Sequence, residues 1–303
     1  MKANRERRKV KHETTTPAVL AAVVAFGSWG VLPVYWKALA HLGSDLALAH
    51  RVVWTLAFVM PLLMLRREWK EWLSNLAKPR VLGIHLWSGF LLAINWGVFI
   101  WAAHHNRIVE CSLGYFLNPL LNVLIGFLVL GERLSRMQMT SIALAAIGVA
   151  MQIAVVGKMP WIALLLAMSF GFYALARRQS PLGSLPGLAM ESLVFLPLAL
   201  GYLVYAGAKS RALWGNGTWA DIVLIIGLGV ITAIPLLGFA FAARKLSFSL
   251  LGLLQFLAPT GQFIVGAWLY REPVSSASIA SFIFIWAAVV VFCRDLSGKS
   301  QRS

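Results

Sequence analysis

Long apolar segments separated by short polar breaks fill almost the whole chain. Each apolar run is close to the roughly 20 residues that an α-helix needs to cross the hydrocarbon core of a bilayer. The pattern predicts ten spans, at 18–39, 46–65, 81–103, 111–130, 137–156, 160–176, 186–206, 221–243, 248–270 and 275–293. Because the connections between these runs are short, we expect an all-α membrane protein with no separate soluble domain.

The composition agrees with a chain whose solvent is lipid. Hydrophobic residues make up 59% of the chain and charged residues only 13%, whereas soluble domains have about 45–50% and about 25%. The two cysteines, Cys111 and Cys293, are too few and too far apart to indicate a disulfide framework or a metal site. We therefore expect no bound metal and no cofactor.

The formal charge of +16 is distributed unevenly among the connections. If the N-terminus lies inside, 20 of the 27 Lys and Arg residues fall on the inner side and five on the outer side. Cytoplasmic loops of membrane proteins carry such an excess of basic residues. The charge is therefore an orientation signal and not a nucleic-acid-binding face, and it predicts that both termini are cytoplasmic.

The second half of the chain repeats features of the first half after a shift of about 140 residues. The fourth and ninth predicted spans share four matched positions: Pro119 with Pro259, Asn122 with Gln262, Gly126 with Gly266 and Glu132 with Glu272. Each half holds five spans, so an odd number of crossings makes the second copy enter the membrane from the opposite side. We expect inverted-topology repeats at 18–156 and 157–293, flanked by tails at 1–17 and 294–303.

Two five-helix halves that end their fourth spans with matched Pro, Gly and Glu resemble the EamA domains of the drug/metabolite transporter (DMT) superfamily. Within it, the chain is similar to the chloramphenicol-sensitive RarD group over HRVVW (50–54), NWGVFIWAAHHNRIVECSLGYFLNPLLNVLIGFLVLGERLSRMQ (95–138) and FSLLGLLQFLAPT (248–260). The resemblance implies a permease of the bacterial inner membrane and leaves its cargo open. The second copy departs from the pattern, because it has Arg271-Glu272-Pro273 where the first has Gly131-Glu132.

Inverted repeats are typical of secondary transporters, in which the two halves rock around a central site. We therefore expect a permease that moves a small organic metabolite or drug by alternating access, with protons as a candidate coupling ion. The expected partners are the lipid bilayer and this substrate, and the oligomeric state stays open. The alternatives are a channel or uncoupled facilitator, and a membrane-embedded enzyme. We assign no catalytic residue, because the spans lack the acidic pairs that such an enzyme needs.

Polar groups inside the spans are the candidate site, since they are costly in a membrane unless they face a cavity or a partner. Arg51 suits an anionic substrate because a guanidinium binds carboxylates in a bidentate geometry; its alternative role is to cap helix carbonyls. The other candidate substrate-binding residues are His50, Lys37, Asn95, Trp96, Tyr115, Asn118 and Gln255. Hydrogen bonding between helices explains the amides equally well.

Glu191 is the one carboxylate placed well inside a predicted span, which makes it the candidate proton carrier. The alternative is a structural ion pair. We do not expect a direct bridge to Arg51, because inversion places these two positions on opposite sides of the midplane. Pro119 and Pro259 leave backbone carbonyls without partners and are the candidate hinges.

Overall fold

The computed structural model describes residues 2–131, 134–156, 159–209, 218–243, 245–246 and 254–300, and all regular elements among them are helical. In chain order they are α1 (Lys2–Ala38), η1 (Ala40–Leu42), α2 (Ser44–Leu65), α3 (Trp69–Leu76), α4 (Pro79–His104), α5 (Ile108–Leu130), α6 (Arg136–Val156), α7 (Trp161–Arg178), α8 (Ser184–Ala208), α9 (Trp219–Ala243), α11 (Leu257–Ile264), the π-helix η2 (Val265–Leu269) and α12 (Ser276–Ser300). The prediction of an all-α protein is confirmed for this part of the chain.

Within the described residues, seven helices are long and apolar enough to cross a membrane by length and composition: α1 from Thr16, α2, α4, α5, α8, α9 and α12. Shorter apolar helices, Arg136–Met151 and Trp161–Arg177, occupy the fifth and sixth predicted spans. The ninth predicted span contains α11 and η2, and its residues 248–253 lie outside the described part.

Two elements differ from the predicted pattern. Helix α1 begins at Lys2, so the basic segment before the first span is helical. Helix α3 lies where the sequence predicted only a connection, and it buries Trp72 and Asn75 while Trp69 is exposed. A search for runs of about 20 apolar residues overlooks such an element, because its signal is a short amphipathic stripe and not overall hydrophobicity.

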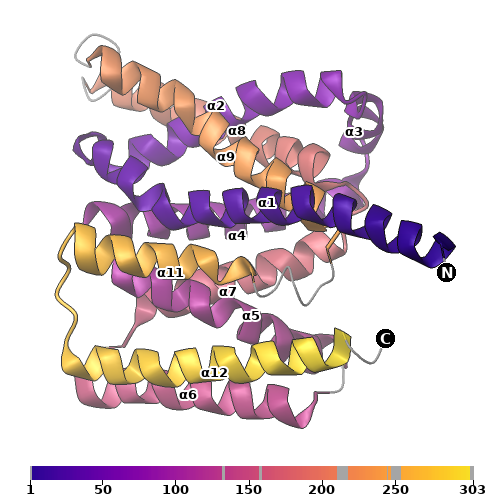
Figure 1. The fold of residues 1–303 in the computed structure, drawn as a ribbon. Helices are drawn as coiled ribbons and strands as arrows, with labels where there is room; N and C mark the ends of the chain where they lie inside the picture. The colour runs from indigo at the N-terminus through magenta and orange to yellow at the C-terminus, as the bar shows by residue number, and fades with distance from the viewer. Residues whose placement is uncertain are drawn as a thin grey trace.

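The long helices run side by side, and α6 and α12 form a pair at one edge (Figure 1). The first turns of α1 and the last turns of α12 lie at the same end of the bundle (Figure 1). The other principal helix contacts are α4 with α7 and α8, α2 with α8 and α9, α1 with α9 and α11, and α5 with α7 and α11.

Two of these helix crossings depend on glycine. A Cβ atom on Gly229 of α9 would lie 2.3 Å from the carbonyl oxygen of Trp54 on α2. A Cβ atom on Gly89 of α4 would lie 2.8 Å from the ring of Phe195 on α8. Lipid is as apolar as a leucine side chain, so helices associate in a membrane through close packing, which small residues permit. A larger residue at Gly229 would push α9 away from the backbone of α2, and one at Gly89 would force the ring of Phe195 to move.

Glu272 joins the end of η2 to the start of α5. Its two carboxylate oxygens accept hydrogen bonds from the backbone N–H groups of Ile108 and Val109, both at 2.8 Å. The first N–H groups of a helix have no partner within the helix, and the helix dipole favours a negative charge there. Glu272 therefore caps the first turn of α5; its matched residue Glu132 lies outside the described residues.

We expect Glu272→Ala to lower the free energy of unfolding by about 2 kcal/mol, because it leaves two buried N–H groups unsatisfied. Glu272→Gln keeps one acceptor oxygen and should lower the free energy of unfolding by less. Thermal unfolding of the purified protein in detergent measures the effect, with Glu71→Ala as a control on an exposed carboxylate. Equal melting temperatures for Glu272→Ala and the control would show that the cap does not stabilise the protein.

Candidate functional site

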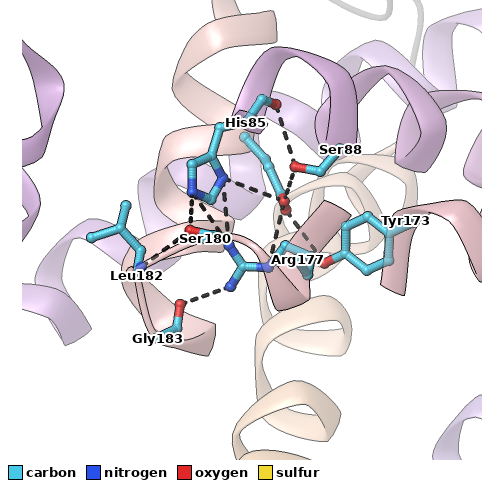
Figure 2. Close-up of polar contacts among 8 residues, drawn as sticks. His85, Ser88, Tyr173, Arg177, Ser180, Leu182 and Gly183 are labelled. Atoms are coloured by element: carbon cyan, nitrogen blue, oxygen red, sulfur yellow. Dashed lines mark hydrogen bonds and ion pairs between the residues drawn. The ribbon is translucent and has the colours of Figure 1, made fainter. Parts of the chain in front are cut away.

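Glu191 on α8 is the centre of a buried polar network, and its side chain is almost fully enclosed. Ser88 of α4 donates a 2.6 Å hydrogen bond to its Oε1, and the Tyr173 hydroxyl of α7 donates to its Oε2 at 3.4 Å. Its Oε1 also lies 3.5 Å from the His85 Nδ1 and 3.7 Å from the Arg177 Nε (Figure 2). The network therefore joins α4 to α7 and α8 through one carboxylate.

Backbone contacts hold Arg177 in this network. Its Nη2 donates a 2.8 Å hydrogen bond to the carbonyl of Gly183, where α8 begins (Figure 2). Its guanidinium lies directly against Gly187, since a Cβ atom there would be 1.8 Å from Nη1. His85 is anchored in turn, because its Nε2 lies 2.8 Å from the Ser180 hydroxyl. Glycine at position 187 thus makes the space that the guanidinium occupies.

The sequence singled out Glu191 but not its partners. In the sequence, Arg177 contributed only to the excess of basic residues that predicts orientation, and His85 belonged to no recognisable motif. The pairing depends on how α4, α7 and α8 pack, which the sequence pattern did not predict. One sequence feature could have indicated these partners: a histidine, an arginine and a lone carboxylate lie near the ends of three neighbouring spans.

Arg51 of α2 forms a second polar centre and is only 5% exposed. Its guanidinium carbon lies 3.7 Å from the ring centroid of Trp96 on α4 and 5.2 Å from that of Trp36 on α1. Such stacking is attractive because the face of an aromatic ring is negative. Arg51 takes part in none of the ion pairs found among the described residues, and its Nε has no hydrogen-bond partner there.

Asn95 and Tyr115 link three helices beside this centre. The Asn95 amide donates to the carbonyl of Leu166 at 3.0 Å and to the Ser169 hydroxyl at 3.1 Å, both on α7. The Tyr115 hydroxyl of α5 donates to the Asn95 Oδ1 at 3.1 Å. In this structure the Asn95 amide is therefore occupied by hydrogen bonds between helices, the alternative that the sequence left open.

The remaining candidate residues lie in other surroundings. Lys37 donates a hydrogen bond to the side-chain oxygen of Asn106 and lies 5.1 Å from the ring centroid of Tyr270. Asn118 of α5 is buried, and its Oδ1 has no partner among the described residues. Gln255 is half-buried just before α11. The candidate hinges Pro119 and Pro259 lie within α5 and α11.

A small pocket lies between α2, α4 and α8. Trp96, which stacks on Arg51, borders it on one side, and Glu191 borders it on another. Its other lining residues are mostly apolar: Val52, Gly89, Leu92, Ala93, Ser192 and Phe195. The pocket therefore has a carboxylate on one side and, on another, the tryptophan ring that lies against Arg51.

The apolar spans and buried polar centres define a multi-pass helical membrane protein, and comparison with known proteins names its family. Residues 16–154 match the EamA-like transporter family. The uncharacterized transporter YojE of Bacillus subtilis is 40% identical over 93% of this chain and 95% of its own length. Protein RarD of Escherichia coli is 36% identical over 95% of this chain and 98% of its own length. The chain therefore belongs to the EamA-like transporter family.

A solved crystal structure of another protein supports the fold alone. It is 19% identical, covers 91% of this chain and 97% of its own, and superposes with a TM-score of 0.58. The family membership and the resemblance to RarD that the sequence suggested are confirmed. The protein is a bacterial membrane transporter.

We expect Gly187→Ala to displace the Arg177 guanidinium, because the new methyl group would occupy its position. The free energy of unfolding should fall by about 2 kcal/mol, since Glu191 loses a charged partner. Arg177→Gln should have a similar effect, and the double variant should be no less stable than either single variant. Thermal unfolding measures all three, with Gly201→Ala, which meets no atom within 4 Å, as the control. Additive losses in the double variant would show that Gly187 acts independently of Arg177.

Proposed function

We propose that the protein is a secondary transporter of the bacterial inner membrane that moves a small organic metabolite or drug by alternating access. In this proposal ten helical segments form two inverted halves, with α1, α2, α4, α5 and α6 in the first and α7, α8, α9, α11 with η2, and α12 in the second. Both termini then lie in the cytoplasm. The shared position of the ends of α1 and α12 in Figure 1 is consistent with this orientation.

The observation that carries the proposal is that the principal contacts between the halves are preserved when each helix is replaced by its counterpart in the other half. Replacing each helix by its counterpart turns α4–α7 into α1–α9, α5–α7 into α1–α11, and α2–α9 into α4–α8, and all of these pairs are in contact. The pairs α2–α8, α5–α11 and α6–α12, which are also in contact, map onto themselves. A pseudo-two-fold axis between inverted repeats requires this pairing, as in many secondary transporters.

Individual residues follow the same exchange. Gly89 lies 140 positions before Gly229, and Trp54 lies 141 positions before Phe195. The contact of Gly89 with Phe195 is thus the counterpart of the contact of Gly229 with Trp54. The shift of about 140 residues between the halves was inferred from the sequence alone. The residues that meet at these two crossings are related by the same shift, and this independent spatial match supports the duplication.

The Glu191 network suits a gate that proton binding opens. It connects α4 of the first half to α7 and α8 of the second half through charged contacts. A proton on Glu191 would remove the charge that holds Arg177 and His85, and would free the halves to move apart. In the proposed orientation this gate lies toward the cytoplasm.

We expect saturable uptake and counterflow by the protein in proteoliposomes. The test solutes are those that raise the melting temperature of the purified protein in a screen, because a ligand of the folded state stabilises it. Counterflow, in which internal unlabelled solute drives accumulation of labelled solute, distinguishes a carrier from a channel. Flux that rises linearly with concentration and shows no counterflow would identify a channel or facilitator instead.

We expect Glu191→Gln to abolish the pH dependence of uptake, because glutamine keeps the shape but cannot exchange a proton. Uptake by the wild-type protein should change with pH in a way that tracks an imposed proton gradient. The matched control is Glu71→Gln, an exposed carboxylate on α3. A Glu191→Gln variant with unchanged pH dependence would show that Glu191 is not the proton carrier.

A further inference from the structure

Arg51 is a buried cation inside an apolar bundle, and no carboxylate among the described residues neutralises it. A charge taken out of water is costly unless it is paired and hydrogen-bonded, and ionisable groups at membrane depth mark substrate or ion pathways. The rings of Trp36 and Trp96 lower this cost, and the Nε donor of Arg51 has no hydrogen-bond partner among the described residues. The five donors of an arginine form a planar fork that matches a carboxylate.

The carboxylates that the structure describes inside or beside the spans are engaged elsewhere. Their partners are His85 and Arg177 for Glu191, Tyr202 for Asp45, His41 for Asp221, Arg107 for Glu110, Ser135 for Asp295, and the start of α5 for Glu272. The rest of the described protein therefore supplies no counter-ion for Arg51. Glu191, by contrast, accepts hydrogen bonds from both Ser88 and Tyr173.

Further polar atoms without partners gather on the same part of α2. His50 is 3% exposed and its Nε2 has no hydrogen-bond partner among the described residues. Thr55, one turn after Arg51, is fully buried and its Oγ1 likewise has none. Buried polar groups in folded proteins are nearly always satisfied. Two such atoms on the same helix as the unpaired guanidinium Nε of Arg51 favour a binding site for a polar group.

We propose, building on the transport function above, that Arg51 binds the anionic end of the substrate and that the substrate is an organic carboxylate with a flat, apolar body. The carboxylate is bound by the guanidinium fork, with His50 and Thr55 as additional polar contacts. The body packs along the ring of Trp96, which lies between Arg51 and the small apolar pocket bordered by Phe195, Leu92 and Val52.

This assignment makes charge the basis of selectivity. A site built to pair a buried cation rejects a neutral analogue, because binding the analogue leaves the cation unpaired. A carboxylate and its amide have nearly the same shape, so they separate the contribution of charge from that of the apolar pocket. Lysine at position 51 would keep the charge but lose the bidentate geometry.

The test compares benzoate with benzamide, and phenylacetate with phenylacetamide, as ligands of the purified full-length protein. We expect each carboxylate to raise the melting temperature and to change tryptophan fluorescence saturably, and each amide to bind at least about tenfold more weakly. Arg51→Gln should reduce carboxylate affinity about tenfold or more and abolish the preference over the amide, whereas Arg51→Lys should retain part of it. Trp96→Phe should weaken both members of each pair.

Matched controls keep the result interpretable. Arg80→Gln removes an exposed arginine from α4, and Trp87→Phe changes a tryptophan of the same helix that is 54% exposed; both should bind like the wild type. If Arg51→Gln does not fold, the paired comparison in the wild-type protein still tests the charge preference. Carboxylates that leave the wild type unaffected, or amides that bind equally well, would overturn the proposal.

Uptake in proteoliposomes separates this failure from failure of the transport function. Saturable counterflow of a solute without preference for a carboxylate over its amide would overturn the assignment of Arg51 and leave the carrier intact. Flux of benzoate that is saturable in the wild type and lost in Arg51→Gln, but not in Arg80→Gln, is the result that the proposal predicts.

Discussion

The close approach of helices at Gly89 and Gly229 positions both polar centres. Gly89 brings α4 against α8, and a Cβ atom there would lie 3.6 Å from the Cβ of Glu191. Gly229 brings α9 against α2 at Trp54, three residues after Arg51. Because helices in lipid gain no hydrophobic energy from leaving water, such contacts must hold the bundle together. The buried polar groups depend on these crossings for their surroundings.

The two crossings correspond under the proposed repeat but carry different chemistry. His50 and Glu191 occupy matching positions, 141 residues apart. At Glu191 the carboxylate is contacted by polar and charged side chains of two other helices, α4 and α7. At Arg51, beside His50, the cation is enclosed by tryptophan rings and has no anion among the described residues. In the proposed repeat, divergence at matching positions would let one crossing form a gate while the other binds the substrate.

Much of this arrangement could be predicted from the sequence because lipid imposes simple rules on it. Apolar runs predicted the helices, and the rarity of charge within them singled out Glu191 and Arg51. The partners of Glu191 could not be predicted, because they depend on which faces of α4, α7 and α8 meet. For the same reason the sequence could not decide whether Asn95 serves a substrate or, as in the structure, bonds to Leu166, Ser169 and Tyr115.

The central claim is that the two halves cross the membrane in opposite directions, and labelling of equivalent loops tests it most directly. Lys78 precedes α4, and Thr218, 140 residues later, precedes α9; both are exposed. Single cysteines at these positions, in a parent lacking Cys111 and Cys293, are probed with a membrane-impermeant maleimide in intact cells and in inverted vesicles. The account predicts labelling of Thr218→Cys from outside and of Lys78→Cys from the cytoplasmic side. Labelling of both from the same face would contradict it.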